Sequence, residues 1–107
     1  MVLDRQSLDK VNKALSLKTD IETLYQLSMD EKPEIRSCIA SNKNTPKNAF
    51  LNLVRDREWW IRRDVATNPR TPMNLLEKLL SDENSEVREA AASHPKMIKK
   101  QQKFKSK

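Results

Sequence analysis

The sequence contains no glycine in 107 residues, and this absence excludes several kinds of site. Phosphate-binding loops of the Walker type and the dinucleotide-binding type need glycine at fixed places, so both are ruled out. Turns that require a positive φ angle must use Asn or Asp, which disfavours tight hairpins. Cys38 is the single cysteine, so we expect neither a disulfide framework nor a cysteine-based metal site. The sequence therefore predicts no metal and no cofactor.

Long apolar runs are also missing, since none reaches the roughly 18 residues that a membrane helix needs. The first residues, Met1-Val2-Leu3 followed at once by Asp4-Arg5-Gln6, lack the pattern of a signal peptide. The length fits one domain. We therefore expect a cytoplasmic, single-domain protein with no membrane partner.

Acidic residues are absent from the last part of the chain. No acid follows Glu89, whereas six lysines do, which leaves fifteen basic and fifteen acidic residues in the rest of the sequence. The formal charge of +6 therefore belongs to the C-terminal tail, and the body is neutral. The tail lysines are candidates for contacts with nucleic-acid phosphates: Lys96, Lys99, Lys100, Lys103, Lys105 and Lys107.

What the sequence does contain is an internal repeat of 26 residues. The segment 40–46 (Ala-Ser-Asn-Lys-Asn-Thr-Pro) returns as 66–72 (Ala-Thr-Asn-Pro-Arg-Thr-Pro), and again in part from Ala92. The register holds without a gap, which marks a repeat protein. Matching apolar positions are Leu24, Phe50 and Leu76; Leu27, Leu53 and Leu79; Ile35, Ile61 and Val87; and Ile39, Val65 and Ala91.

Each unit is predicted to form two short helices. Thr45 and Thr71 are candidate N-caps, and Pro46 and Pro72 follow at the first helical position, where a missing N–H costs nothing. Apolar residues then recur at i, i+3 and i+4. Helices this short are marginal alone, so each unit must bury its apolar side against its neighbours.

We therefore predict an all-α solenoid of about three two-helix repeats with terminal caps. Residues 1–97 form one helical-repeat domain, with a cap at 1–13, repeats at 14–39, 40–65 and 66–91, and a partial repeat at 92–97. In the cap, Ser7 is a possible N-cap, and Leu8, Val11 and Leu15 are expected to face inward. Residues 98–107 form either a polar cap helix or a disordered basic tail.

The repeat resembles the leucine-rich repeat variant family over about residues 14–97. The resemblance implies a right-handed superhelix of alternating helices and no particular chemistry, although the 26-residue unit is slightly longer than the family's. Some relatives carry a cysteine-bound iron–sulfur cluster, which one cysteine cannot support. HEAT-like helical repeats are the close alternative. The matching residues are Ala66-Thr67-Asn68-Pro69, Thr71-Pro72, Leu75-Leu76, Leu79, Asp82 and Val87-Arg88.

An aspartate and an arginine recur in every unit. Because each pair appears at the same register, we interpret the aspartate as a helix cap and the arginine as its partner or a partner of the next unit. Catalytic pairs are the less favoured reading. The pairs are Asp30 and Arg36, Asp56 and Arg62, and Asp82 and Arg88.

The middle unit departs from its neighbours. It carries six basic and three acidic residues, whereas the first and third units each carry three basic and five acidic ones. Trp59 and Trp60 stand where the other units have Pro33-Glu34 and Ser85-Glu86, so we expect at least one indole to face solvent. Tryptophan and arginine dominate binding hot spots. The alternative is that one tryptophan packs over a neighbouring unit as core. The candidate patch is Trp59, Trp60, Arg55, Arg57, Arg62 and Arg63.

Two single positions also depart from the repeat. Asp64 replaces Cys38 and Ala90 of the other units, so we expect Arg62 or Arg63 to pair with it. This Trp–Arg–Asp group is loosely similar to the HEAT-like alkylpurine DNA glycosylases, but fold analogy is a weak warrant and we predict no enzyme. His94 replaces Asn42 and Asn68 and is read as a loop cap.

Two functions remain open. The first is a protein-interaction module whose Trp/Arg patch binds an acidic groove or peptide on another protein. The second is binding of DNA or RNA, with the lysine tail and the basic middle unit on phosphates and a tryptophan stacked on a base. No small-molecule substrate is evident from the sequence.

Overall fold

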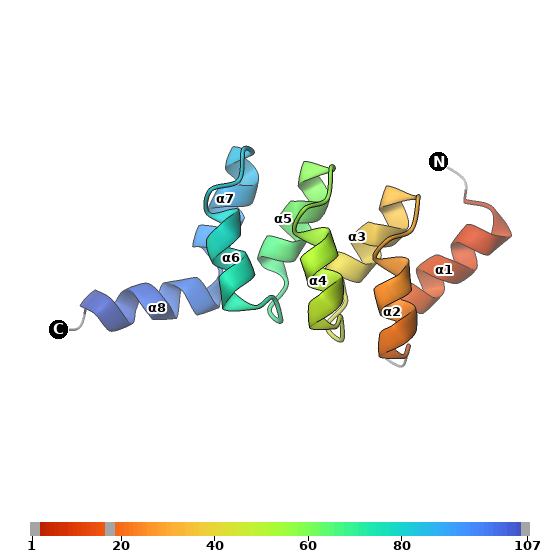
Figure 1. Cartoon of the computed structure of the whole chain (residues 1–107), viewed down its shortest axis with the longest axis horizontal. Coiled ribbons are helices and arrows are strands. Elements are labelled where there is room, and N and C mark those ends of the chain that lie inside the picture. Colours follow the sequence, from red (N-terminus) through yellow and green to blue (C-terminus); the bar gives the residue numbers. More distant parts are fainter. Residues whose placement is uncertain (1–2, 17–18, 106–107) are drawn as a thin grey trace.

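The computed structural model describes residues 3–16 and 19–105, and within these ranges the chain forms helices joined by short loops, with no strand (Figure 1). The predicted all-α class is confirmed. The helices are α1 (Arg5–Leu15), α2 (Ile21–Leu27), α3 (Pro33–Ser41), α4 (Lys47–Leu53), α5 (Trp59–Thr67), α6 (Met73–Leu79), α7 (Ser85–Ala92) and α8 (Pro95–Lys105).

The helices form two layers that run along an elongated molecule of 55 × 28 × 18 Å. The first layer, which we call the odd layer, consists of α1, α3, α5 and α7, each packed against the next. The second layer, α2, α4 and α6, lies across it (Figure 1). Helices α3, α5 and α7 begin at residues 33, 59 and 85, so the 26-residue register of the sequence is also the repeat of the solenoid.

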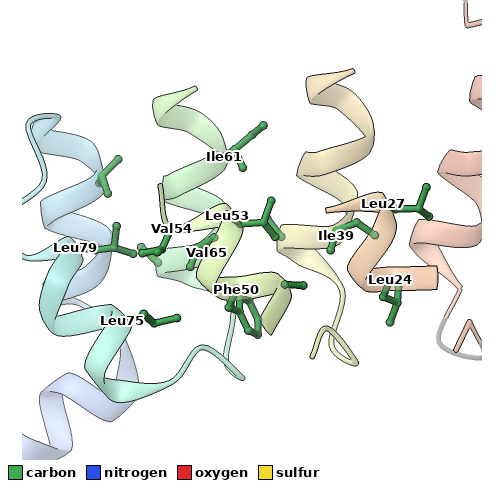
Figure 2. Packing of buried hydrophobic residues seen from close by; sticks show 14 of the residues in the cluster. Leu24, Leu27, Ile39, Phe50, Leu53, Val54, Ile61, Val65, Leu75 and Leu79 are labelled. Atoms are coloured by element: carbon green, nitrogen blue, oxygen red, sulfur yellow. The ribbon is translucent and has the colours of Figure 1, made fainter. Parts of the chain in front are cut away.

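The core lies between the two layers (Figure 2). Its largest side chains are the apolar register positions of the sequence, which are fully or almost fully buried in every unit. Fully burying one such side chain stabilises a fold by about 1.5–3 kcal/mol. Since seven- to nine-residue helices do not persist alone, this packing between neighbouring units holds them in place.

The cap of helix α4 differs from the expected one. Thr45 does not cap the helix through its side chain, because its hydroxyl donates to the carbonyl of Ile39 at 2.5 Å. Thr71 makes the same bond to Val65 in the next unit, at 2.6 Å. Both threonines are buried and so tie the end of one unit to the start of the next.

Helix α1 differs from the expectation in two ways. Its N-cap is Asp4, which accepts the backbone N–H of Ser7 at 2.7 Å, so Ser7 is not the cap. Leu8 and Leu15 do not face inward, because their side chains are 50% and 60% exposed. The register explains this: Leu8 corresponds to the half-buried Glu34 of α3 and the exposed Glu86 of α7, and Leu15 corresponds to the exposed Ser41 of α3.

At the other end, helix α8 extends beyond the two-layer body (Figure 1). Met97 is buried near its start, whereas Ile98 is exposed. The helix covers most of the segment 98–107, for which the sequence left a cap helix and a disordered tail as alternatives.

Candidate functional site

The repeated arginines and aspartates form a ladder between units. Arg36 donates from Nε to Asp56 Oδ2 at 2.8 Å and from Nη2 to Asp56 Oδ1 at 3.2 Å. Arg62 makes the same two bonds to Asp82, with the same distances. Bidentate pairs of this kind are both strong and geometrically specific. Each arginine therefore connects its own unit to the following one.

Backbone contacts complete the ladder within each unit. Arg62 Nη1 donates to the carbonyl of Asp56, and Asp56 Oδ1 accepts the N–H of Glu58 at 3.0 Å. The hydrogen bonds that Arg62 donates to the carboxylate of Asp82 raise the pKa of Arg62. Burial opposes ionisation of Asp82, but its bonds from Arg62 and the N–H of Asn84 outweigh burial and lower its pKa.

Arg62 is consequently a scaffold residue. Its side chain is buried, with 8% relative exposure for the residue, and its guanidinium is engaged on both sides. Arg62 is therefore not part of the surface patch, although the sequence placed it both in that patch and among the recurring Asp–Arg pairs. Arg88 is exposed and donates to the carbonyl of Asp82 at 2.7 Å, and among the described residues it pairs with no carboxylate of a following unit.

A second ladder uses the connecting-loop position. Asn68 Nδ2 donates to the carbonyls of Ala40 at 2.7 Å and Asn42 at 3.0 Å, and its Oδ1 accepts the N–H of Arg70 at 2.9 Å. His94 reproduces this arrangement: Nε2 lies 2.8 Å from the carbonyl of Asn68, and Nδ1 accepts the N–H of Lys96 at 3.1 Å. These two bonds together require the proton on Nε2. His94 is thus a structural substitute for asparagine.

The two tryptophans begin helix α5 and are both half-buried, packed against the core. Neither is as exposed as the polar residues Ser85 and Glu86 at the same register in α7. The Arg63 guanidinium lies over the Trp59 ring, 5.2 Å from its centroid. Trp60 has no such cover and stands at a register position that faces solvent in α7.

The remaining patch arginines lie in the loop between α4 and α5. Arg55 and Arg57 are both exposed. Arg57 lines an open cleft of about 370 Å³ between this loop and the α2–α3 loop of the preceding unit, together with Asp30, Glu31 and Arg36 among other residues. The patch therefore divides into a loop part, Arg55 and Arg57, and a part on α5.

Asp64 is paired differently from the expectation. Its Oδ2 accepts a hydrogen bond from the Ser37 hydroxyl on α3 at 2.7 Å, and no ion pair joins it to Arg62 or Arg63 in the described structure. Burial raises the pKa of Asp64, while Ser37 and the nearby charge of Arg63 oppose this rise. Asp64 thus links α3 to α5, and the neighbouring Cys38 thiol also has a raised pKa because it is buried and lies near Asp64.

The tail lysines are partly engaged. Lys96 Nζ donates to the carbonyl of Thr71 at 2.9 Å, and Lys100 forms an exposed ion pair with Glu77 at 2.8 Å. Lys99 and Lys103 are exposed on α8. Lys105 is the last residue of the helix, and Lys107 lies outside the described residues.

The exposed leucines of α1 are a surface feature that sequence reasoning missed. The signal was present, because the register already aligned Leu8 with Glu34 and Leu15 with Ser41. The amphipathic pattern of α1, taken without the register, predicts that this apolar side faces inward. In the structure, Ser7 and Ala14 are the buried residues of this helix.

Two further searches of the described residues gave clear results. Among residues 3–16 and 19–105, no three His, Cys, Asp or Glu side chains are grouped so that they could hold a metal ion. In the same part of the chain, every helix is too short or too polar to cross a bilayer.

Comparison with known proteins gave one match. The family model of the HEAT repeat matches residues 73–94, which span α6, the following loop and α7. This match supports a HEAT-like helical repeat, the alternative named from the sequence; no match supports the leucine-rich repeat variant family. No curated protein and no solved structure matches the chain.

Proposed function

We propose that this chain is a helical-repeat module that binds another protein, with Trp60 on α5 as its central contact. HEAT-like repeats commonly serve as interaction modules, and the extended surface of a solenoid suits that role. Trp59 and Arg63 support the site, because the guanidinium over the Trp59 ring restrains both side chains. Arg55 and Arg57 form its rim on the neighbouring loop.

One observation carries this proposal. The residues that form the scaffold bonds recur in successive units, whereas α3 and α7 have no tryptophan at the register of Trp60. The Arg–Asp and Asn ladders account for the other conspicuous polar residues of the middle unit. Trp60 replaces the glutamate found at the same register in α3 and α7. A half-buried indole on a surface helix has apolar area available to a partner, and such residues are enriched in hot spots.

The test uses the neighbouring units as its guide. Trp60→Glu gives the middle unit the residue that its neighbours carry, so the fold should tolerate it, with a stability loss of about 1 kcal/mol. A random-peptide display library would be selected on the wild-type protein. Selected peptides should bind the Trp60→Glu variant at least about tenfold more weakly.

Binding would be read from tryptophan emission and by calorimetry, with Trp60→Gln as an uncharged second variant. Selected peptides that bind all three proteins with equal affinity would refute the proposal. A Trp60→Gln variant that loses the helical circular dichroism would place Trp60 in the core and refute it as well.

Nucleic-acid binding is kept as a second candidate, favoured by the five lysines of α8 and its lack of acids. Phosphate binding would weaken steeply with salt, with a slope of about −0.9 per phosphate neutralised on duplex DNA. Replacing Lys99 and Lys103 by Gln would flatten that slope in a titration of labelled DNA and RNA. Lys96 and Lys100 already contact the body, which reduces the charge available to phosphates.

A further inference from the structure

The solvent side of the odd layer changes from one end of the solenoid to the other. At one register position its helices carry Leu8, Glu34, Trp60 and Glu86 in turn. At a second position, two turns further along, Leu15 stands where α3 carries Ser41, α5 carries Thr67 and the C-cap of α7 is Ser93. Large apolar residues therefore occur on this surface at α1 and at α5, but not on α3 between them.

The apolar part on α1 forms a stripe of Leu8, Val11 and Leu15, with spacing i, i+3 and i+7. Leu8 and Leu15 are exposed and Val11 is half-buried. The stripe continues onto α3 at Cys38. Val11 and Cys38 correspond, one unit earlier, to Ser37 and Asp64, and since Ser37 and Asp64 are hydrogen-bonded between α3 and α5, Val11 and Cys38 lie at the equivalent place between α1 and α3. Nothing within the described chain covers Leu8 or Leu15.

The space between α1 and Trp60 fits one helix. Helices packed side by side lie about 8–10 Å apart, so the axes of α1 and α5 are roughly 16–20 Å apart. A helix with its side chains is about 10 Å wide, so it can lie along α3 between the two. Over most of its length α3 presents only short side chains there, Ser37, Cys38 and Ser41, which allows close approach.

The charge of this surface selects the partner. Four carboxylates, Glu34, Asp64, Glu86 and Glu89, lie at its register positions, against one arginine, Arg63. Arg63 is stacked on Trp59, and Arg62 is buried in its pair with Asp82. The helical surface is therefore acidic, although the whole chain is basic and the rim residues Arg55 and Arg57 lie on the adjoining α4–α5 loop. It complements a basic partner rather than the acidic one expected from the sequence.

We propose that the solvent side of the odd layer docks a basic amphipathic helix of another protein, which lies along α3. Its apolar side contacts the Leu8–Val11–Leu15 stripe and Trp60, and its basic residues face Glu34. The glutamates of α7, on the far side of α5, add to the negative potential of this surface. This inference rests on the proposed function, since it shares Trp60, and it adds the partner's chemistry and a second contact surface 52 residues away in sequence.

The test uses two synthetic helical peptides of about 14 residues, or four turns. Both carry leucine at i, i+3, i+4 and i+7; the first has lysine and glutamine elsewhere, and the second has glutamate in place of lysine. Titrated against the wild-type protein and followed by tryptophan emission, the lysine peptide should bind at least tenfold more tightly than the glutamate peptide. Equal binding of the two peptides would overturn the proposed charge selection.

Protein variants then locate the contact. The variant Leu8→Glu/Leu15→Ser gives α1 the residues of α3, and it should bind the lysine peptide at least tenfold more weakly. The matched control is Ile21→Lys/Met29→Arg. It removes two other exposed apolar side chains, that of Ile21 at the start of α2 and that of Met29 just after its C-cap, and replaces them with the residues found at the same register in the next unit. The control should bind like the wild type. Equal loss in both variants would mean that any exposed apolar residue suffices and would overturn the inference.

The Trp60→Glu variant separates this inference from the proposed function. If Trp60→Glu weakens binding and Leu8→Glu/Leu15→Ser does not, the proposed function stands and the docked helix is wrong. Sedimentation equilibrium of the wild type alone tests a second copy of the chain as the occupant. A dimer that Leu8→Glu/Leu15→Ser converts to monomer would replace the external partner with a second copy and overturn the proposal.

Discussion

Replacing Asn68 by alanine should be among the most damaging single changes in this chain. The side chain is buried and makes three hydrogen bonds, two from Nδ2 to the carbonyls of Ala40 and Asn42 and one from the N–H of Arg70 to Oδ1. Truncation leaves both carbonyls without this donor in a buried site, at about 1–1.5 kcal/mol each, and removes the third bond. The expected loss is about 3 kcal/mol, a large share of the roughly 5–15 kcal/mol that stabilises a domain.

Urea unfolding, followed by far-ultraviolet circular dichroism and tryptophan emission, measures this loss. The matched control is Asn68→His, because His94 makes equivalent bonds at the same register one unit later. A histidine keeps one donated and one accepted bond, so we expect a loss of about 1 kcal/mol. The reasoning is refuted if the alanine variant loses less than about 1 kcal/mol, or if the histidine variant is as unstable as the alanine variant.

Three further predictions follow from the contacts between units. Arg62→Met should lower the free energy of unfolding by about 3–5 kcal/mol because it leaves Asp82 buried without its partner. Arg88→Met, in the last unit of the ladder, should lower it by under about 1 kcal/mol. Equal losses in the two variants would contradict the ladder. Burial raises the pKa of Asp64 above 3.8 in the folded protein. Between the unfolded and the folded pKa of this carboxyl, the folded state therefore binds more protons than the unfolded state. The contribution of Asp64 to the free energy of unfolding thus falls as the pH rises through that range. Asp64→Asn should therefore gain stability relative to the wild type as pH rises from about 4, and a difference that is flat or falls with pH would contradict the assignment. The Leu8→Glu/Leu15→Ser variant should unfold within about 0.5 kcal/mol of the wild type because both leucines are exposed, and a larger loss would mean that they pack in solution.

The sequence was sufficient for the fold because the repeat fixes which positions are buried. Residues such as Phe50 and Ile61 recur as apolar partners in every unit, and each is buried in the structure. The repeat also separated scaffold from exception: the recurring Asp56 and Arg62 proved to be linked to neighbouring units. What the sequence could not give was the carboxylate partner of each arginine. Arg36 pairs with the carboxylate of Asp56, twenty residues later, and contacts the nearer Asp30 through the backbone carbonyl.

The failures occurred where a local pattern was preferred over the register. The amphipathic pattern of α1 suggested an inward Leu8, although the register had already aligned it with a surface glutamate. Thr45 has the composition of an N-cap, yet a buried carbonyl of the preceding helix competes for its hydroxyl. The exposed fraction of Trp59 and Trp60 could not be predicted from the polar residues at the same register in other units. An indole is large enough to pack over part of the core that a smaller polar side chain leaves uncovered.

The first rung of the Arg–Asp ladder offers a stabilising change. Lys10 occupies the arginine register and contacts Asp30 through a single bond of 2.8 Å, whereas Arg36 and Arg62 each make two bonds to their aspartates. Lys10→Arg should restore the second bond and raise the free energy of unfolding by about 0.5–1 kcal/mol, because a charge-assisted bond is added at a carboxylate that is already largely buried. Urea unfolding of the single variant, and of the same change in an Asp30→Asn background, measures the coupling free energy between residue 10 and the carboxylate of Asp30. A gain that persists without the Asp30 carboxylate would mean that arginine acts at this position by some route other than the ladder.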